Sequence, residues 1–256
     1  MSIEPVLVAR GVSKTYGRFV ALAGVDLELQ PGERRALIGP NGAGKSTFLA
    51  ILGGQQAGGS GSSVHFCGRD ISGALPQQIA RLGIGRTFQI SRTFRRLTVL
   101  DNMRTALLPA TGGALGLSAA RLAALREPAL RMLKDLRLAH AADAVAEDLS
   151  HGDRKRLEFG MVLATEPRLL LLDEPTAGMG LAERRGLMEL MVEHTAQRQI
   201  TLLFVEHDID IVFRFADRIT VMSRGKVFAE GTPAEIAQNR SVQEIYLGTE
   251  ARRADD

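Results

Sequence analysis

Cysteine is almost absent from this chain of 256 residues, and tryptophan does not occur in it. The one cysteine, Cys67, cannot form an internal disulfide or a paired-cysteine metal site, which indicates a reducing compartment. No apolar run reaches the roughly 18 residues that span a bilayer, and the leucine run Leu169–Leu172 is far too short. The first residues lack a basic stretch followed by an apolar core, so no secretory signal is expected. If the chain works at a membrane, we expect a partner to hold it there.

The net charge of the chain is also small. The chain has 32 lysines and arginines against 29 aspartates and glutamates, a formal net charge of +3. This charge is too small to indicate a nucleic-acid partner by itself. Hydrophobic residues make up 45% of the chain and charged residues 24%. These proportions are typical of a globular protein and argue against extended disorder.

The N-terminal part is expected to begin with β structure. Val25, Leu27 and Leu29 alternate with polar residues, which predicts a half-buried strand. A turn follows at residues 31–32, and Arg35–Ile38 is expected to form a buried strand that runs into a glycine-rich loop. A helix is predicted from residue 45 to the glycine pair at 53–54, and a short strand at Val64–Cys67.

Residues 100–149 differ in character from the rest. They are rich in Ala, Leu and Arg with helical periodicity, which predicts a helical insertion between two parts of one α/β domain, 1–99 and 150–256. Beyond the insertion, Leu169–Leu172 and Thr201–Val205 are continuously apolar, as expected of parallel strands covered on both faces. Residues 219–229 predict a closing hairpin, and Pro233 is expected to open a C-terminal helix.

The loop GPNGAGKST matches the pattern G-x-x-x-x-G-K-[ST]. Glycine is needed in such a loop because the backbone must turn its N–H groups inward toward a phosphate, and the following helix adds its positive end. Lys45 is expected to reach the β- and γ-phosphates, Ser46 to bind Mg²⁺, and Thr47 to touch the α-phosphate. A chance glycine-rich turn is the alternative, and the position between an apolar strand and a helix argues against it. The predicted nucleotide-binding residues of this loop are Gly39, Pro40, Asn41, Gly42, Ala43, Gly44, Lys45, Ser46 and Thr47.

Two acidic residues follow the apolar strand at 169–172. Ligands of an α/β sheet bind beyond the carboxyl ends of its parallel strands, so Asp173 and Glu174 are expected beside the triphosphate. Asp173 would hold Mg²⁺ through water, and Glu174 would act as the general base toward the attacking water. An acidic loop that caps a helix is the plainer alternative. His207 follows the strand at 201–205 and would reach the same edge; a lone histidine is more often structural, but this position favours a functional one.

A second glycine-bearing helix start, LSHGDRKRLE, begins at residue 149. Ser150 suits an N-cap and Gly152 leaves the first turn open, so this helix start is a candidate anion site. Together with the glycine loop, LLLLDEP and the histidine after FVE, the fragment resembles the nucleotide-binding subunit of ABC transporters. The resemblance runs from Tyr16 to Tyr246–Gly248. The family signature LSGGQ is matched here by Leu149, Ser150, His151, Gly152 and Asp153.

This resemblance implies the fold class. The expected fold is α/β, a P-loop NTPase core on a RecA-like mixed sheet, with an N-terminal antiparallel β subdomain and an inserted helical signature subdomain. The insertion would hold the helix start at Ser150 away from the chain's own glycine loop. The signature would then bind the γ-phosphate of a nucleotide held by a second subunit, and two chains facing head to tail would enclose two ATP molecules.

The resemblance also gives roles to residues that mean little alone. Tyr16 would stack on adenine, although a lone tyrosine could equally belong to the core. Gln89, in IGRTFQ, would contact Mg²⁺ or the attacking water and link the site to a membrane subunit. The stretch Ser91–Arg96 would line the surface that receives a cytoplasmic helix of that subunit; on charge alone, a solvated face is an equal alternative.

Several fragments resemble one subfamily in particular, among them GRTFQ, EHDIDIVFRFADRITVM and GTPAEI. Its members energise the uptake of branched-chain amino acids, and their relatives handle urea or short amides. The resemblance implies an ATP hydrolase that uses ATP and Mg²⁺, peripheral on the cytoplasmic face of the cell membrane. The implied partners are a second ATPase subunit, identical or related, two transmembrane permease subunits and, indirectly, a periplasmic or extracellular solute-binding protein. No nucleic-acid partner is expected.

The chain departs from the family pattern at three places. His151 replaces the second glycine of the signature, and Asp153 replaces its glutamine. That carboxylate would lie near the neighbour's phosphate unless it points away or pairs with Arg154 or Arg156. The segment Ala177–Gly180, which we call the D-loop, lacks the common aspartate and leaves communication between the two sites open.

Two other functions fit parts of the pattern. A soluble ABC-type ATPase of DNA repair or translation would carry a long coiled-coil insertion or two fused cassettes, which this chain does not. A non-hydrolysing regulatory module is opposed by the intact set of Lys45, Asp173, Glu174 and His207.

Overall fold

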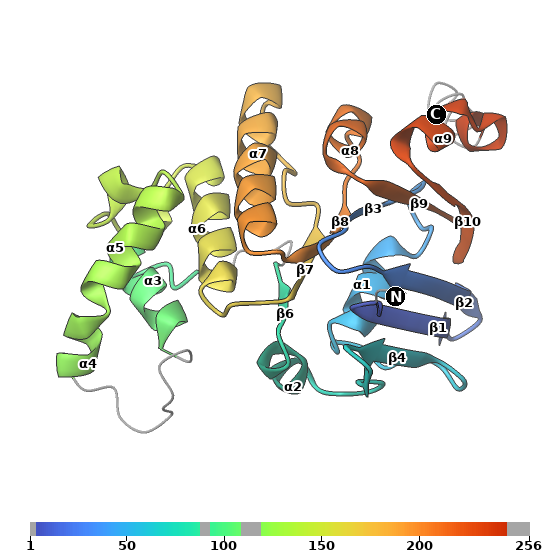
Figure 1. The fold of residues 1–256 in the computed structure, drawn as a ribbon, viewed down its shortest axis with the longest axis horizontal. Helices are drawn as coiled ribbons and strands as arrows, with labels where there is room; N and C mark the ends of the chain where they lie inside the picture. The colour runs from blue at the N-terminus through green and yellow to red at the C-terminus, as the bar shows by residue number, and fades with distance from the viewer. Residues whose placement is uncertain (1–3, 88–92, 109–118, 245–256) are drawn as a thin grey trace.

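The computed structural model of the chain describes residues 4–87, 93–108 and 119–244. An antiparallel sheet lies beside a mixed sheet, and a group of helices extends to one side of both (Figure 1). The antiparallel sheet has the order β2-β1-β4-β5, as predicted for the β subdomain. Its strands are β1 (Leu7–Tyr16), β2 (Phe19–Leu29), β4 (Ser63–Phe66) and β5 (Arg69–Asp70).

The mixed sheet has the order β10-β9-β3-β8-β7-β6. Neighbouring strands are parallel except β9 and β10, which form an antiparallel hairpin. The predicted parallel strands and closing hairpin are therefore confirmed. The strands are β3 (Arg34–Ile38), β6 (Ile84–Arg86), β7 (Leu169–Asp173), β8 (Thr201–Val205), β9 (Arg218–Ser223) and β10 (Lys226–Gly231).

The leucine run of β7 is apolar throughout because both faces of this sheet are covered. Leu170 and Leu172 belong to one buried cluster, which includes residues of the helices after the insertion. Leu169 and Leu171 belong to a second cluster, which includes residues of the helix after the glycine loop and of the antiparallel sheet. Successive side chains of a strand point to opposite faces, so a strand between two layers needs apolar residues at every position.

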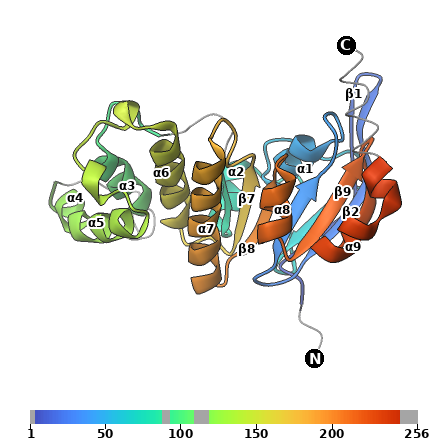
Figure 2. The same ribbon diagram turned by 90° about the horizontal axis from the view of Figure 1, so that it is seen from above.

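The helices lie on both sides of the mixed sheet and beyond its edge (Figures 1 and 2). The C-terminal helix begins at Pro233, as predicted. The helices are α1 (Lys45–Leu52), α2 (Pro76–Arg81), α3 (Val99–Leu107), α4 (Ala119–Ala124), α5 (Arg126–Asp135), α6 (His151–Leu163), α7 (Leu181–Gln197), α8 (Ile209–Phe215) and α9 (Pro233–Gln238), with 3₁₀ turns η2 (Ala139–Ala141) and η3 (Ala146–Asp148).

The described residues of the insertion form helices as predicted, and α3 and α5 pack on α6. A Cβ atom placed on Gly160 of α6 would lie 2.1 Å from Cδ1 of Leu136, so this glycine allows α6 to approach the end of α5. Met103 of α3 and Phe159 of α6 are fully buried in the same cluster. The signature helix is thus anchored to the insertion by apolar contacts.

Two local details differ from expectation. Strand β1 was not predicted, and the predicted strand at 64–67 ends one residue early. Cys67 has a left-handed φ of 49°, which lies outside the β region and turns the chain there. Within the described residues, we find no helix both long and apolar enough to cross a membrane.

Candidate nucleotide-binding and hydrolysis site

Several of the predicted site residues gather where parallel strands of the mixed sheet end. The glycine loop, residues 39–44, follows β3; Glu174 follows β7; and His207 follows β8. Strand β3 pairs with β8, and β8 pairs with β7. Because neighbouring parallel strands end at the same edge, three segments far apart in the sequence meet there.

The glycines of the loop are required by close approaches. A Cβ atom on Gly39 would lie 2.1 Å from the carbonyl oxygen of Met222, and one on Gly44 would lie 2.6 Å from that of Ala21. Both glycines also have positive φ, 148° and 100°. Any side chain would therefore clash with the backbone of β9 or β2, and the loop can keep its curvature only with glycine.

Lys45 begins α1 and is almost entirely buried, with 6% of its surface exposed. Its Nζ donates to the carbonyl oxygens of Gly39, at 2.7 Å, and Pro40, at 3.1 Å. Burial lowers the pKa of Lys45, while the nearby carboxylates of Glu174 and Asp173 oppose that shift. These hydrogen bonds hold the ammonium group against the backbone of the glycine loop. An anion bound there would meet a partly desolvated cation.

Asp173 lies between a hydroxyl and a guanidinium group. Its Oδ1 accepts a hydrogen bond from Oγ of Ser46 at 3.3 Å, and its Oδ2 lies 3.3 Å from NH2 of Arg86. The hydroxyl and the carboxylate are hard oxygen donors of the kind that Mg²⁺ takes. The sequence analysis did not select Arg86 as a site residue. Its place in IGRTFQ, at the end of β6, is the pattern that could have indicated it.

Glu174 and His207 contact each other directly. Nε2 of His207 lies 2.8 Å from Oε1 of Glu174, and because a carboxylate oxygen accepts, Nε2 carries the hydrogen. Glu174 has a left-handed φ of 50°, and its N–H donates to the carbonyl of Val205 at 3.0 Å. Strained backbone of this kind clusters at functional sites, where surrounding structure holds it.

A second glutamate at this edge has a different environment. Glu206 is buried, and its Oε1 accepts hydrogen bonds from the N–H and the hydroxyl of Thr176 at 3.0 and 2.7 Å. Burial raises the pKa of Glu206 in spite of these hydrogen bonds. The sequence did not indicate Glu206 as a site residue, because there it only marks the end of strand β8.

The signature begins α6 as predicted. Ser150 is the N-cap, and its hydroxyl accepts a hydrogen bond from the N–H of Asp153 at 3.1 Å. The carboxylate of Asp153 pairs with Arg156, whose NH1 lies 3.1 Å from Oδ1. The possible repulsion of a neighbouring phosphate by Asp153 is thus reduced by a cation on the same helix.

Signature and glycine loop lie apart within the chain. In Figures 1 and 2, α7 and β7 stand between α6 and α1. Leu149 and Gly152 are buried, whereas Ser150, His151 and the first turn of α6 face outward at least in part. A single chain therefore brings its glycine loop and its two acidic residues together but not its signature.

Tyr16 lies at the end of β1, opposite Phe19 of β2. Both residues are exposed, Tyr16 by 44% and Phe19 by 61%, and the Tyr16 hydroxyl donates to Oε1 of Gln56. A Cβ atom added to Gly44 would lie 2.6 Å from the carbonyl oxygen of Ala21, so β2 passes close to the glycine loop. An adenine bound beside the loop would therefore have two aromatic residues to stack on, Tyr16 and Phe19. The sequence indicated only Tyr16. Gln89 lies outside the described residues, as do Ser91, residue 92 and Tyr246–Gly248.

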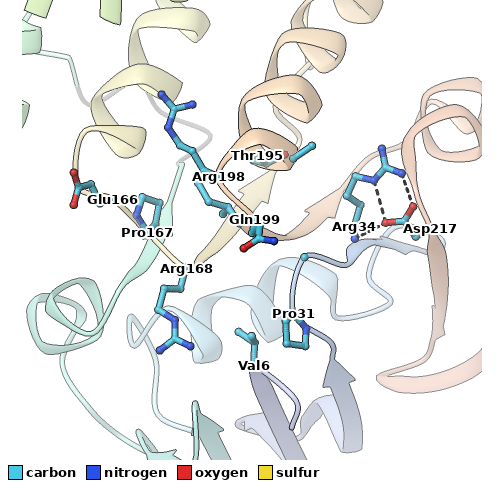
Figure 3. Close-up of a pocket in the computed structure, with 13 residues that line it drawn as sticks. Val6, Pro31, Arg34, Glu166, Pro167, Arg168, Thr195, Arg198, Gln199 and Asp217 are labelled. Atoms are coloured by element: carbon cyan, nitrogen blue, oxygen red, sulfur yellow. Dashed lines mark hydrogen bonds and ion pairs between the residues drawn. The ribbon is translucent and has the colours of Figure 1, made fainter. Parts of the chain in front are cut away.

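One large cavity of the molecule lies away from the site residues described above. A cavity of about 980 Å³ lies at the opposite edge of the sheet, where β3, β7 and β8 begin (Figure 3). Arg34 in it is paired with Asp217, and Arg198 donates to Nδ1 of His194 at 3.0 Å. In the ranges that the structure describes, no three His, Cys, Asp or Glu side chains gather to hold a metal by themselves.

A glycine loop after the parallel strand β3, a buried lysine at the start of the helix that follows the loop, and two carboxylates at the end of β7 define the class: a P-loop nucleoside-triphosphatase. Comparisons with known sequences identify the family within this class. Residues 22–177 match the family model described as ABC transporter, and residues 226–252 match that of the branched-chain amino acid ATP-binding cassette transporter. The chain belongs to the ABC transporter family and is one of its ATPases.

Curated relatives resemble the whole chain. One is the high-affinity branched-chain amino acid transport ATP-binding protein LivG of Salmonella typhimurium, 37% identical over 96% of this chain and 98% of that protein. Another is BraF of Pseudomonas aeruginosa, also named as a high-affinity branched-chain amino acid transport ATP-binding protein, 33% identical over 96% and 98%.

Solved structures agree with the fold. The ADP conformation of MJ1267, an ATP-binding cassette of an ABC transporter, superposes with a TM-score of 0.82 at 30% identity, covering 96% of this chain and 99% of that one. A dimeric structure of MJ0796, a bacterial ABC transporter cassette, has a TM-score of 0.76 at 28% identity, covering 89% and 98%. The predicted family and fold class are confirmed.

Proposed function

We propose that this chain is the ATP-hydrolysing subunit of an importer for branched-chain amino acids. The names of LivG and BraF and the family match at residues 226–252 support this cargo over urea or short amides. The observation that carries the hydrolytic role is the convergence of Lys45, the Ser46–Asp173 contact and the Glu174–His207 contact at one sheet edge.

In the proposed reaction, Lys45 and the N–H groups of the loop hold the phosphates of ATP. Ser46 and Asp173 would hold Mg²⁺, which would neutralise charge on the β- and γ-phosphate oxygens. Glu174 accepts a proton from the attacking water, and the Nε2 hydrogen of His207 keeps that carboxylate in position. Catalysis is mainly positioning and charge stabilisation, without a covalent intermediate. Gln89 remains a proposed contact of the metal or the water.

We propose further that the site is completed by a second subunit, identical or related. The outward Ser150 helix start and its distance from the chain's own loop support this arrangement, as does the dimeric state of MJ0796. The insertion, residues 100–149, would act as the unit that carries the signature to the neighbour's γ-phosphate. Tyr16 would stack on the adenine of the chain's own nucleotide.

A groove supports the proposed contact with two permease subunits at the cytoplasmic membrane surface. It has a volume of about 490 Å³ and lies between α2, β6, α3 and α6. Phe94, half exposed, lines it together with Met161 and Val162. Because Phe94 belongs to the stretch predicted to receive a permease helix, an apolar helix face is the occupant we propose.

The test is the substitution Glu174→Gln, with Glu189→Gln as the matched control. Glu189 is an exposed residue of α7 that pairs with Arg214. Glu174→Gln is expected to lower phosphate release by at least about 100-fold while ATP binding persists and a closed dimer accumulates. Normal turnover by this variant would refute the assignment of the base. Co-purification of permease subunits and uptake of labelled leucine or urea by the complex would decide the cargo.

A further inference from the structure

Two departures from the family pattern contact each other. Nε2 of His151, in the signature, lies 3.0 Å from the carbonyl oxygen of Ala177, in the D-loop. A carbonyl can only accept, so Nε2 carries the hydrogen and the imidazole donates. The histidine that replaces a signature glycine is therefore hydrogen-bonded to the segment that lacks its aspartate.

Glycines bring the two segments close together. A Cβ atom on Gly152 would lie 2.5 Å from Oε1 of Glu183 and 3.3 Å from Cε of Met179, so the first turn of α6 rests on the D-loop and the start of α7. Gly178 has a φ of 79°, and a Cβ atom there would lie 3.6 Å from Nε2 of His151. The imidazole ring therefore lies directly beside the D-loop backbone.

The D-loop is in turn tied to the catalytic glutamate. The N–H of Ala177 donates to the carbonyl of Glu174 at 3.1 Å, so one peptide segment accepts from His151 and donates to Glu174. The distance along the chain from the His151 contact to the catalytic residue is three residues. If the start of α6 were displaced, the displacement would be passed to Glu174 through residues 174–177.

Arg184 anchors the other end of the D-loop. Gly180, the N-cap of α7, provides no side-chain hydrogen bond. Nε of Arg184 instead donates to the carbonyl of Met179 at 2.7 Å, and NH1 lies 3.1 Å from Oδ2 of Asp208. Asp208 follows His207, which contacts Glu174. The D-loop is thus held between the signature and the Glu174–His207 pair.

We infer that His151 and Arg184 are positioning residues that couple the two ATP sites of the dimer, in place of a D-loop carboxylate. This inference rests on the proposed function, since Ser150 must contact the neighbour's phosphate. When that phosphate is bound, His151 fixes the D-loop, and the D-loop fixes Glu174 of the chain's own site. ATP at one site thereby promotes hydrolysis at the other, and turnover depends cooperatively on ATP concentration.

The test measures ATP turnover of the full chain against ATP concentration. The wild type is expected to show a Hill coefficient above 1; a hyperbolic dependence would overturn the inference at once. His151→Ala is expected to bring the coefficient to about 1 and to lower turnover roughly 5- to 150-fold, the usual range of coupling between sites. His151→Gln, whose amide can still donate, should restore most of both. His140→Ala, at an exposed histidine of η2, is the matched control.

A double-mutant cycle tests whether the two residues act through one path. If they do, His151→Ala combined with Arg184→Ala lowers turnover no further than the more damaging single variant does. Additive losses would show separate effects and contradict the inference. Thermal melting identifies any variant that fails to fold, and Arg184→Lys, which keeps the charge but not the fork, then replaces Arg184→Ala.

Failure of the coupling and failure of the proposed function give different results. If Ser150→Ala and Glu174→Gln lower turnover while His151→Ala keeps full cooperativity, the hydrolytic role stands and the coupling is wrong. If neither Ser150→Ala nor Glu174→Gln changes turnover, the proposed function itself is wrong.

Discussion

Nε2 of His207 donates to Oε1 of Glu174 across 2.8 Å, which joins the ends of β8 and β7. The two strands are neighbours in the sheet, although the two residues lie 33 positions apart in the chain. Glu174 has a left-handed φ of 50°, and the hydrogen bond from His207 holds its carboxylate in one direction. His207 is the partner that touches it.

We predict that His207→Ala lowers kcat for ATP hydrolysis by about 100-fold. The carboxylate of Glu174 would lose its contact with this imidazole and sample other directions. The dissociation constant for ATP should change little, because the side chain of His207 is hydrogen-bonded to Glu174 and not to the glycine loop. Steady-state kinetics together with equilibrium nucleotide binding checks this, and a loss of affinity with an unchanged kcat would contradict it.

Lys45→Met is expected to abolish ATP binding without unfolding the protein. Burial already lowers the pKa of Lys45, so the charged side chain has a desolvation cost that methionine removes. ATP at 100 times Kd should stabilise the wild type by about 2.7 kcal/mol, or very roughly 5–10 °C in Tm. Thermal melting with and without ATP measures this shift, which should vanish in the variant. Loss of the folded state without ATP would show a structural role instead.

Glu206→Gln is expected to change how stability depends on pH. Burial raises the pKa of Glu206 above its ordinary value of 4.5, so the folded state holds this proton more tightly than the unfolded state does. The contribution is fully present below pH 4.5 and is lost as pH rises through the folded-state value. Glutamine can still accept from Thr176 and has no charge to bury. Urea melts at several pH values should show the variant gaining on the wild type as pH rises; parallel curves would count against it.

Gly180→Asp is expected to stabilise the protein by roughly a few tenths of a kcal/mol, since an aspartate side chain can accept a hydrogen bond at the N-cap of α7 and glycine has no side chain to do so. Gly180 has a φ of −69°, and a Cβ atom added there would meet open space, so the substitution is unstrained. Gly178→Asp is the matched control: its φ of 79° should make the same residue destabilising by about 1 kcal/mol. Equal changes in Tm for the two variants would refute this explanation.

Much of the fold followed from short local patterns. The alternation at Val25, Leu27 and Leu29 indicated a half-buried strand, and continuous leucines indicated a strand covered on both faces; each pattern reflects what the neighbouring layer requires. Strand β1 escaped notice, and β4 ends early because Cys67 takes a left-handed conformation. Such a turn depends on the chain around it more than on the residue type.

The candidate site likewise includes residues that the sequence indicated and contacts that only the structure showed. The sequence alone determined the glycine loop, Asp173, Glu174 and the Ser150 cap, because each depends on residue types at fixed spacing along one segment. Only the tertiary structure decided that Arg86 meets Asp173, that Arg156 neutralises Asp153 and that His151 reaches Ala177. These contacts join different elements or depend on which way a side chain turns, and that direction is set by packing between layers rather than by the order of residues in the chain.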